Sequence, residues 1–201
     1  MEQALAIADD AADVSTTLQG VTAGVEERAA RMGVELRFGR AGLLDAVEHL
    51  WLGLFDHHTS VGAAGLPVIA RELSWPRRRA LYETLLGKPD AFVLLATRDQ
   101  AAVGYVLAHI HEGADDTWPT GSRIGEIESL VVLPSVRGVG LGNLLMDAAE
   151  QRLAEVGAHD VLLRVLVGND GARRFYQRRG MTAVMTTMLK LGSPPTERQP
   201  A

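Results

Sequence analysis

Residues 137–142 read Arg-Gly-Val-Gly-Leu-Gly, and this junction between a strand-like run and an amphipathic helix pattern constrains the fold most. Glycine adopts left-handed conformations and permits close ligand approach, so its repetition here predicts a tight turn. The turn opens a helix, whose first backbone N–H groups lack partners and carry partial positive charge. Such a helix start suits a phosphate or pyrophosphate, and Arg137 adds a cation at its mouth.

Two nucleotide-binding motifs also place glycines at a helix start, and the spacing here matches neither. The Walker A loop requires a lysine after its last glycine, and none follows Gly142. The dinucleotide fingerprint requires Gly-x-Gly-x-x-Gly, whereas the glycines here stand at 138, 140 and 142. A dinucleotide binder is therefore disfavoured but stays open as an alternative, as does a tight turn without a ligand.

Composition excludes several classes of protein. The chain has 201 residues, of which 47% are apolar, enough for one domain with a sizeable core. A formal charge of −5 argues against nucleic-acid binding. The absence of cysteine excludes disulfides, thiolate metal sites and a cysteine nucleophile. No apolar run reaches the roughly 18 residues of a membrane helix, and no signal-peptide pattern is present. We therefore expect a cytoplasmic protein that does not bind membranes.

Periodicity predicts a single domain over residues 31–191, with a loosely ordered or helical extension at 1–30 and a disordered tail at 192–201. The expected fold is α/β, a mixed sheet flanked by helices, with a right-handed parallel crossover between residues 124 and 167. The expected strands are 34–38, 91–97, 102–110, 124–133, 161–167 and 181–191. The expected helices are 43–55, 74–86, 140–156 and 169–179, of which the last is capped by Asn169 and ended by Gly180.

Two stretches together resemble one protein family. Residues 130–142 resemble the acetyl-coenzyme A signature of the GCN5-related N-acetyltransferases, whose pattern Gln/Arg-x-x-Gly-x-Gly/Ala is met at 137, 140 and 142. Residues 169–180, with Asn169, Ala172, Phe175, Tyr176 and Gly180 in place, resemble a later helix of the family. The resemblance covers residues 34–191 and departs from the family at position 181, where methionine replaces an aromatic residue.

The resemblance implies a mostly antiparallel sheet of six to seven strands, splayed between strands four and five to admit acetyl-CoA as co-substrate. It implies a transferase that moves an acetyl group directly to a primary amine of a small molecule or peptide, without a metal, in a possible homodimer. The alternative is a non-catalytic acyl-CoA-binding sensor or regulatory module. The residues expected to bind the cofactor are Leu130, Val131, Val132, Arg137, Gly138, Val139, Gly140, Leu141, Gly142, Asn169, Ala172, Arg173 and Tyr176.

Three side chains are candidates for the chemistry. By the resemblance, Tyr176 lies near the cofactor sulfur and protonates the departing thiolate. Glu126 and Glu128 are candidate bases, because alternation along a strand places them on one face with Leu130 and Val132. Glu126 is slightly favoured and the choice stays open. The family also implies an oxyanion donor, the backbone N–H of Val131 or of a neighbour.

Several other residues allow two readings. His57 and His58 are expected at the end of the first helix, exposed or lining a substrate pocket; adjacent helical histidines diverge, which disfavours a metal site. Arg173 and Arg174 are expected either to reach phosphates or to be solvated, and residues 77–79 (Arg-Arg-Arg) are expected on a helix surface. Two interpretations are open for Trp75, Asp115, Asp116 and Trp118. They form either an acidic, aromatic mouth for a cationic amine or a plain surface loop with a packed Trp.

Overall fold

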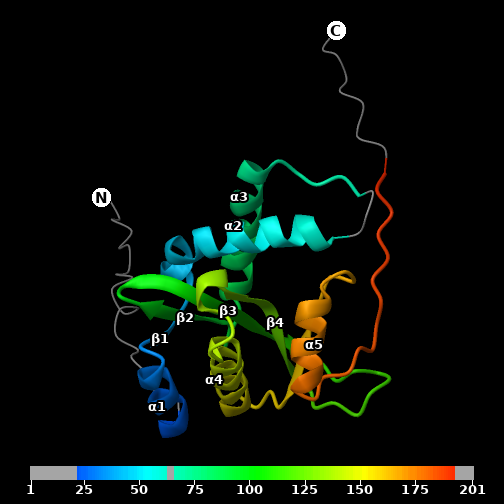
Figure 1. Ribbon diagram of the computed structural model, residues 1–201. Coiled ribbons are helices and arrows are strands. Elements are labelled where there is room, and N and C mark those ends of the chain that lie inside the picture. The colour runs from blue at the N-terminus through cyan, green and yellow to red at the C-terminus, as the bar shows by residue number, and fades with distance from the viewer. Residues whose placement is uncertain (1–21, 63–65, 193–201) are drawn as a thin grey trace, which may run out of the picture.

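The computed structural model describes residues 22–62 and 66–192, which form one sheet with helices on both faces (Figure 1). Within these ranges the sheet has five strands in the order β1-β2-β3-β4-β5. The strands are β1 (Glu35–Gly39), β2 (Phe92–Arg98), β3 (Ala101–Glu112), β4 (Arg123–Val132) and β5 (Asp160–Leu163). The helices are α1 (Ala23–Arg31), α2 (Leu44–Val61), α3 (Arg71–Leu86), α4 (Leu141–Glu155) and α5 (Asp170–Arg178), with short 3-10 turns η2 (Ala41–Leu43) and η3 (Pro134–Val136).

The strand connections follow from local chemistry. β1 to β4 pair antiparallel in sequence order, and β5 pairs parallel with β4 after the α4 crossover. β2 and β3 meet in a tight hairpin at Asp99 and Gln100, whose φ angles are 50° and 63°. Two positive φ angles in a two-residue turn give the twist that suits a hairpin. The mixed α/β architecture and the parallel crossover pairing are therefore confirmed.

Two apolar clusters hold the helices to the sheet. α1 and α4 cover one face, where Leu144, Leu145 and Leu153 of α4 are buried against β2, β3 and β4, and Phe175 and Tyr176 of α5 pack beside them. The other face is covered by α2 and α3, with aromatic and aliphatic side chains between them and the sheet. Each large apolar side chain buried in this way contributes roughly 1.5–3 kcal/mol. No helix in the described ranges is long and apolar enough to cross a membrane.

A bulge in β4 changes which side chains share a face. Leu107 of β3 lies opposite Ser129, but the next residue, Ala108, lies opposite Ile127, so Glu128 is an extra residue. Alternation is interrupted there. Ile127 already packs in the α1/α4 cluster, and after the bulge Leu130 and Val132 return to that cluster. Glu126 and Glu128 instead make contacts on the α3 side, so the expectation that they share a face with Leu130 and Val132 is wrong.

β4 and β5 separate where the bulge begins. Their pairing runs only from Ile124 opposite Asp160 to Ile127 opposite Leu163. Residues 128–132 of β4 therefore have β3 on one side and no described strand on the other, and we call that side the open edge. The splay expected between the fourth and fifth strands is confirmed. The predicted strand at 161–167 is shorter than expected and ends at Leu163.

Other predicted boundaries were also wrong. Residues 181–191 form no strand and pair with no described strand, and Met188 is 89% exposed, because an apolar run alone does not supply a partner edge. α3 begins at Arg71 rather than Ser74, so Pro76 lies inside the helix. Within the expected extension, residues 23–31 form α1, where Val25 and Ala29 are buried. The remainder of that extension, residues 1–21, and the tail at 193–201 lie outside the described residues.

Candidate active site

The glycine-rich turn adopts the conformation that its sequence predicts. Gly138 and Gly140 have φ angles of 82° and 96°, in the left-handed region that favours glycine. Gly140 is the N-cap residue of α4, and its carbonyl accepts the first helical hydrogen bond, from the N–H of Leu144. The N–H groups of Leu141, Gly142 and Asn143 therefore have no acceptor within the helix. These main-chain donors at a helix start form a site for an anion.

Arg137 joins this turn to the end of β4. Its Nε donates a hydrogen bond to the main-chain oxygen of Val132 over 2.9 Å. The guanidinium therefore lies where β4 gives way to the turn, beside the helix start. Val139 is exposed at the tip of the turn. A group bound at the N-terminus of α4 would thus meet Arg137 and main-chain amides together.

The main chain of β4 offers donors along the open edge. The N–H of Leu133 donates to the oxygen of Val103, which belongs to the β3 side of the ladder. Because these directions alternate in an antiparallel pair, the N–H of Val131 also faces β3, and those of Leu130 and Val132 face the open edge. Val131 is therefore placed to hold the sheet together, and its two neighbours are placed to meet a ligand.

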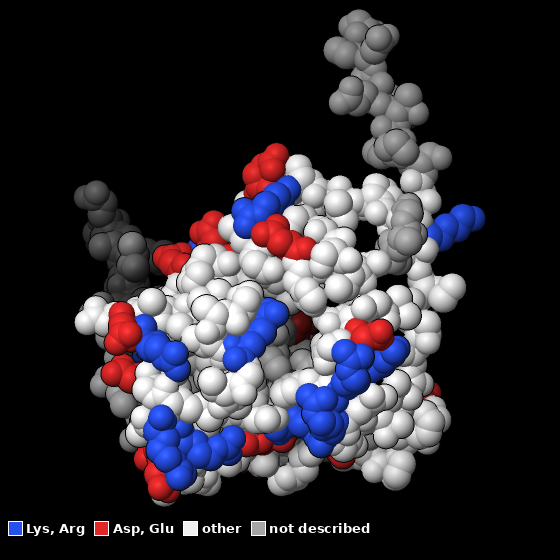
Figure 2. Space-filling view, viewed as in Figure 1, with Lys and Arg blue, Asp and Glu red and all other residues white. Residues whose placement is uncertain are grey.

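Acidic groups are recessed at the splay. Figure 2 shows a hollow between the start of α4 and α5, with acidic atoms inside it and basic side chains gathered near α5. Glu126 is only 4% exposed and lies directly across from His109 of β3. Its Oε2 is 3.7 Å from Nε2 of His109, and its Oε1 accepts a hydrogen bond from Nη1 of Arg164. A carboxylate so buried requires such partners.

Glu128, the bulge residue, is held from the other side of the sheet by α3. Nη1 of Arg78 donates to its Oε1 over 2.5 Å. The Arg78 guanidinium also stacks over Trp51, with its Cζ 4.0 Å from the ring centroid, and lies 5.4 Å from that of Tyr82. The Tyr82 hydroxyl donates to Ser129 over 2.6 Å. A packed aromatic surface therefore fixes the cation that faces Glu128.

Three side chains with acid–base chemistry form a cluster that can hold a cation. His109, Glu126 and Glu128 each present one ligand atom, and these atoms lie within 4.8 Å of one another. Each carboxylate already accepts one guanidinium hydrogen bond on one of its two oxygens, which leaves most of its acceptor capacity free. Two carboxylates this close repel each other, and a cation placed between them would relieve that repulsion. A substrate ammonium group meets this requirement.

Tyr176 lies on α5, half-buried, with its ring edge-on to Phe175 at 5.1 Å between centroids. Burial raises the pKa of Tyr176 to about 12, and the positive charge of Arg179 lowers it by a smaller amount. The hydroxyl therefore keeps its proton at neutral pH and is a hydrogen-bond donor. Phe175 lies against Gly142, where an added Cβ would meet its ring at 3.6 Å. α5 is thus docked beside the first turn of α4.

The start of α5 has the predicted cap. Oδ1 of Asn169 accepts a hydrogen bond from the N–H of Ala172 over 3.1 Å, and Gly180 ends the helix with a φ of 85°. Arg173 is exposed and pairs with Asp170 one turn earlier at 2.6 Å. Asn169 and Ala172 therefore shape the helix start in this structure.

The other predicted clusters are dispersed. Trp75 of α3 is buried in the cluster between α2, α3 and the sheet, whereas Trp118 is exposed on the loop between β3 and β4, so these two do not form one mouth. Asp115 accepts hydrogen bonds from the N–H groups of Thr117 and Trp118, so its carboxylate stabilises this turn. α2 continues past His58, whose ring lies edge-on to Trp51 at 6.2 Å.

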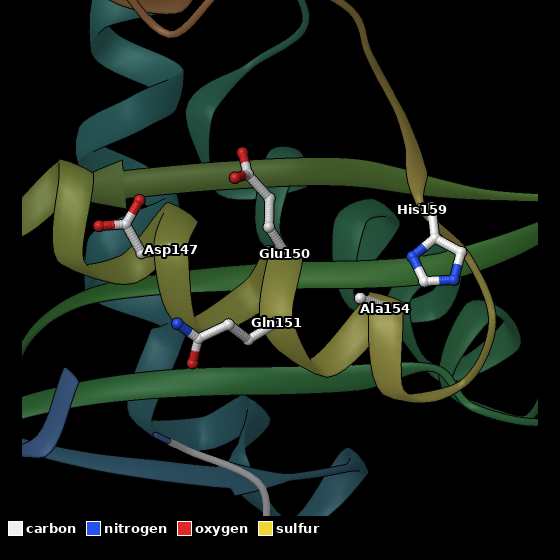
Figure 3. A pocket seen from close by; sticks show the side chains of 5 residues that line it. All are labelled: Asp147, Glu150, Gln151, Ala154 and His159. Carbon is white, nitrogen blue, oxygen red and sulfur yellow. The ribbon is translucent and has the colours of Figure 1, made fainter. Parts of the chain in front are cut away.

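A depression on the outer face of α4 lies apart from this site (Figure 3). It measures about 390 Å³, and its lining residues are Asp147, Glu150, Gln151, Ala154 and His159. Both carboxylates accept hydrogen bonds from Nη2 of Arg179 at 2.8 Å. The two acidic side chains of the depression therefore hold the end of α5 against α4, which is a structural role.

Sequence reasoning missed three side chains of the site. Arg78 was interpreted as helix surface, although it stands three residues after Trp75 and four before Tyr82, the spacing of one helix face. His109 required the pairing register of β3 and β4, which no local pattern gives. Arg164 follows the last residue of β5, and its contact with Glu126 required knowing where that strand ends.

Comparison with known proteins identifies the family. Residues 54–181 match the model of the acetyltransferase (GNAT) family. The aminoalkylphosphonate N-acetyltransferase of Salmonella typhimurium is 32% identical over 121 residues, which are 60% of this chain and 76% of that protein. The chain belongs to the GNAT family, and by that membership it is an N-acetyltransferase.

Solved structures agree on the fold. A GCN5-related N-acetyltransferase from Ralstonia eutropha JMP134 superposes with a TM-score of 0.63 at 22% identity, over 79% of this chain and 99% of that one. An aminoglycoside N-acetyltransferase, AAC(6′)-Iy, in complex with CoA gives a TM-score of 0.60 at 18% identity, over 80% and 95% of the two chains. The expected family fold is thereby confirmed, with five described strands in place of six or seven.

His58 makes stability depend on pH. Burial, then the positive charges of His57 and Arg78, lower the pKa of His58 to about 4 from 6.5. Between these values the unfolded chain binds a proton that the folded chain does not, so stability is full above pH 6.5 and falls toward pH 4. After discounting for partial exposure of the ring, we expect His58→Gln to reduce the loss between pH 7.5 and 4.5 by about 1–2 kcal/mol.

Urea unfolding at both pH values measures this difference. His57→Gln, a change at the adjacent residue, is the matched control. Equal pH dependence of unfolding in the unmodified protein and in His58→Gln would show that His58 does not contribute.

Proposed function

We propose that this protein transfers an acetyl group from acetyl-CoA directly to a primary amine, with Glu126 and Glu128 acting on the amine. The observation that carries the proposal is the placement of both carboxylates where β4 leaves β5, on the same strand that leads into the glycine turn. Names of relatives differ in the acceptor, so they support an amine and no single compound.

The turn and the open edge fit the two ends of the cofactor. The free N–H groups at the start of α4, together with Arg137, would bind the pyrophosphate. The main-chain groups of Leu130 and Val132 would pair with the peptide-like arm as an added strand does. When bound, acetyl-CoA supplies a thioester whose carbonyl carbon accepts the amine. The N–H of Leu130 or Val132 would donate to the thioester oxygen as charge develops there.

The two glutamates would divide the work on the amine. Glu128 holds the ammonium group, and buried Glu126 takes its proton, which frees the nitrogen lone pair for attack. The C–N bond then forms and the C–S bond breaks, with the sulfur leaving as a thiolate that carries the bonding electron pair. The second proton lost from the nitrogen passes to this thiolate through solvent and gives free CoA. No cysteine is present to carry an acyl intermediate, which favours direct transfer.

Tyr176 would assist the departing sulfur chiefly as a hydrogen-bond donor. With its pKa near 12, complete proton transfer to a thiolate whose reference pKa is near 8.5 is uphill by about 5 kcal/mol. A hydrogen bond avoids that cost and still stabilises the developing negative charge. The thiolate is a fair leaving group at neutral pH, so the required help is modest.

Separate substitutions test the two carboxylates. We expect Glu126→Gln to lower kcat by about 100-fold and to remove the acidic limb of its pH–rate profile, as loss of a general base does. Glu128→Gln should instead raise KM for the amine by about 10-fold, because one charged contact is lost. CoA release measured across pH distinguishes these outcomes. If neither variant changes kcat or KM, the two glutamates are not part of the amine site.

Removal of one hydroxyl tests Tyr176. We expect Tyr176→Phe to lower kcat by about 10-fold, the effect of one hydrogen bond to a developing charge, and to leave CoA affinity unchanged. Steady-state kinetics and calorimetry with CoA measure the two effects. Phe175→Leu, a change of packing in the adjacent residue, is the comparison. An unchanged kcat in Tyr176→Phe would remove Tyr176 from the mechanism.

A further inference from the structure

Two carboxylates and two guanidinium groups surround the position proposed for the amine. One carboxylate oxygen of Glu126 and one of Glu128 lie within 4.8 Å of each other, and the two glutamates pair with Arg164 and Arg78 respectively. An ammonium group bound to both carboxylates would therefore have a guanidinium paired with each of its partners. Such an array is matched to a ligand that carries both signs of charge rather than one.

The guanidinium of Arg78 is built into the site. It stacks over Trp51, its side chain is 23% exposed, and its partner Glu128 is 17% exposed. Trp51 is itself fixed, because its Nε1 donates to Ser74 over 2.9 Å. A cation held this rigidly next to the amine position would repel an acceptor with only positive charge.

Arg78 also has N–H donors that bind no acceptor among the described residues. Among the described residues, only its Nη1 donates to a protein acceptor, which leaves Nη2 and Nε available. A guanidinium presents its donors in a planar fork that matches the oxygens of a carboxylate or phosphate. Arg164 is the weaker anchor, because its side chain is 70% exposed and lies in solvent.

We propose that the acceptor is a small primary amine that also carries an oxyanion, a carboxylate, phosphate or phosphonate, and that Arg78 binds this oxyanion. The inference rests on the proposed transfer to an amine and adds the chemical class of the acceptor. Glu128 would bridge the two charges of the ligand, touching the ammonium group with one oxygen and Arg78 with the other.

A matched set of amines tests this class. β-Alanine and 3-aminopropylphosphonate carry an oxyanion, propylamine carries no second charge, and 1,3-diaminopropane carries a second cation. We expect kcat/KM from CoA release to be about 10- to 100-fold higher for the two anionic amines than for propylamine, and lowest for the diamine, since one charge-assisted contact is gained or opposed. Equal values, or a preference for the diamine, would overturn the proposal.

Substitution of Arg78 assigns the preference to this side chain. Arg78→Gln should raise KM for the anionic amines by about 10- to 100-fold and change that for propylamine by less than about threefold. Arg78→Lys keeps the charge and should restore part of the preference even if Arg78→Gln folds poorly. Arg77→Gln, on the exposed face of the same helix, is the matched control. A preference that survives both Arg78 variants would contradict the assignment.

Binding separates this inference from the proposed transfer. If no amine in the set releases CoA, the proposed function fails, and thermal stabilisation of the CoA-loaded protein decides the inference alone. The inference then requires that 3-aminopropylphosphonate stabilise the protein more than propylamine does, and that Arg78→Gln abolish this difference. Equal stabilisation by both compounds would refute it.

Discussion

The site depends on how β4 ends its pairing with β5. The two strands share only four residue pairs, and the bulge at Glu128 begins immediately after the last of them. The open edge of β4 therefore begins at the same place in the strand as the carboxylates of Glu126 and Glu128. The tight packing of β3 and β4 against the helices on both faces holds this geometry, because the bulge could not shift by one residue without moving Ile127 out of its core.

The two faces of the sheet contribute different chemical groups. On the face of α4 and α5, the glycine turn and Arg137 bring main-chain donors and a cation to one helix start, and α5 carries Tyr176 with its protonated hydroxyl beside Phe175. On the face of α2 and α3, aromatic rings hold a guanidinium against the bulge. The proposed anion site and the proposed amine site thus involve different helices and are joined by β4.

Features fixed by local chemistry could be predicted from the sequence. Gly140 had to accommodate a left-handed conformation at a helix start, and Asn169 could cap α5 with its own side chain. Features that depend on pairing could not. The bulge at Glu128 requires the register between β3 and β4, and the strand predicted at 181–191 finds no partner among the described strands. Arg78 was misread because a run of three arginines indicates solvent, although its helical spacing from Trp75 indicates burial.

The central claim is that the helix start at Gly140 binds the diphosphate of CoA. Calorimetry with dephospho-CoA, which keeps the diphosphate, and with pantetheine, which lacks it, measures this most directly in the unmodified protein and in Gly140→Val. Valine is strained at a φ of 96° and would displace the turn. The account predicts that the substitution weakens dephospho-CoA binding by about 10- to 100-fold and leaves pantetheine binding unchanged. Equal losses for both ligands, or no loss for either, would contradict it.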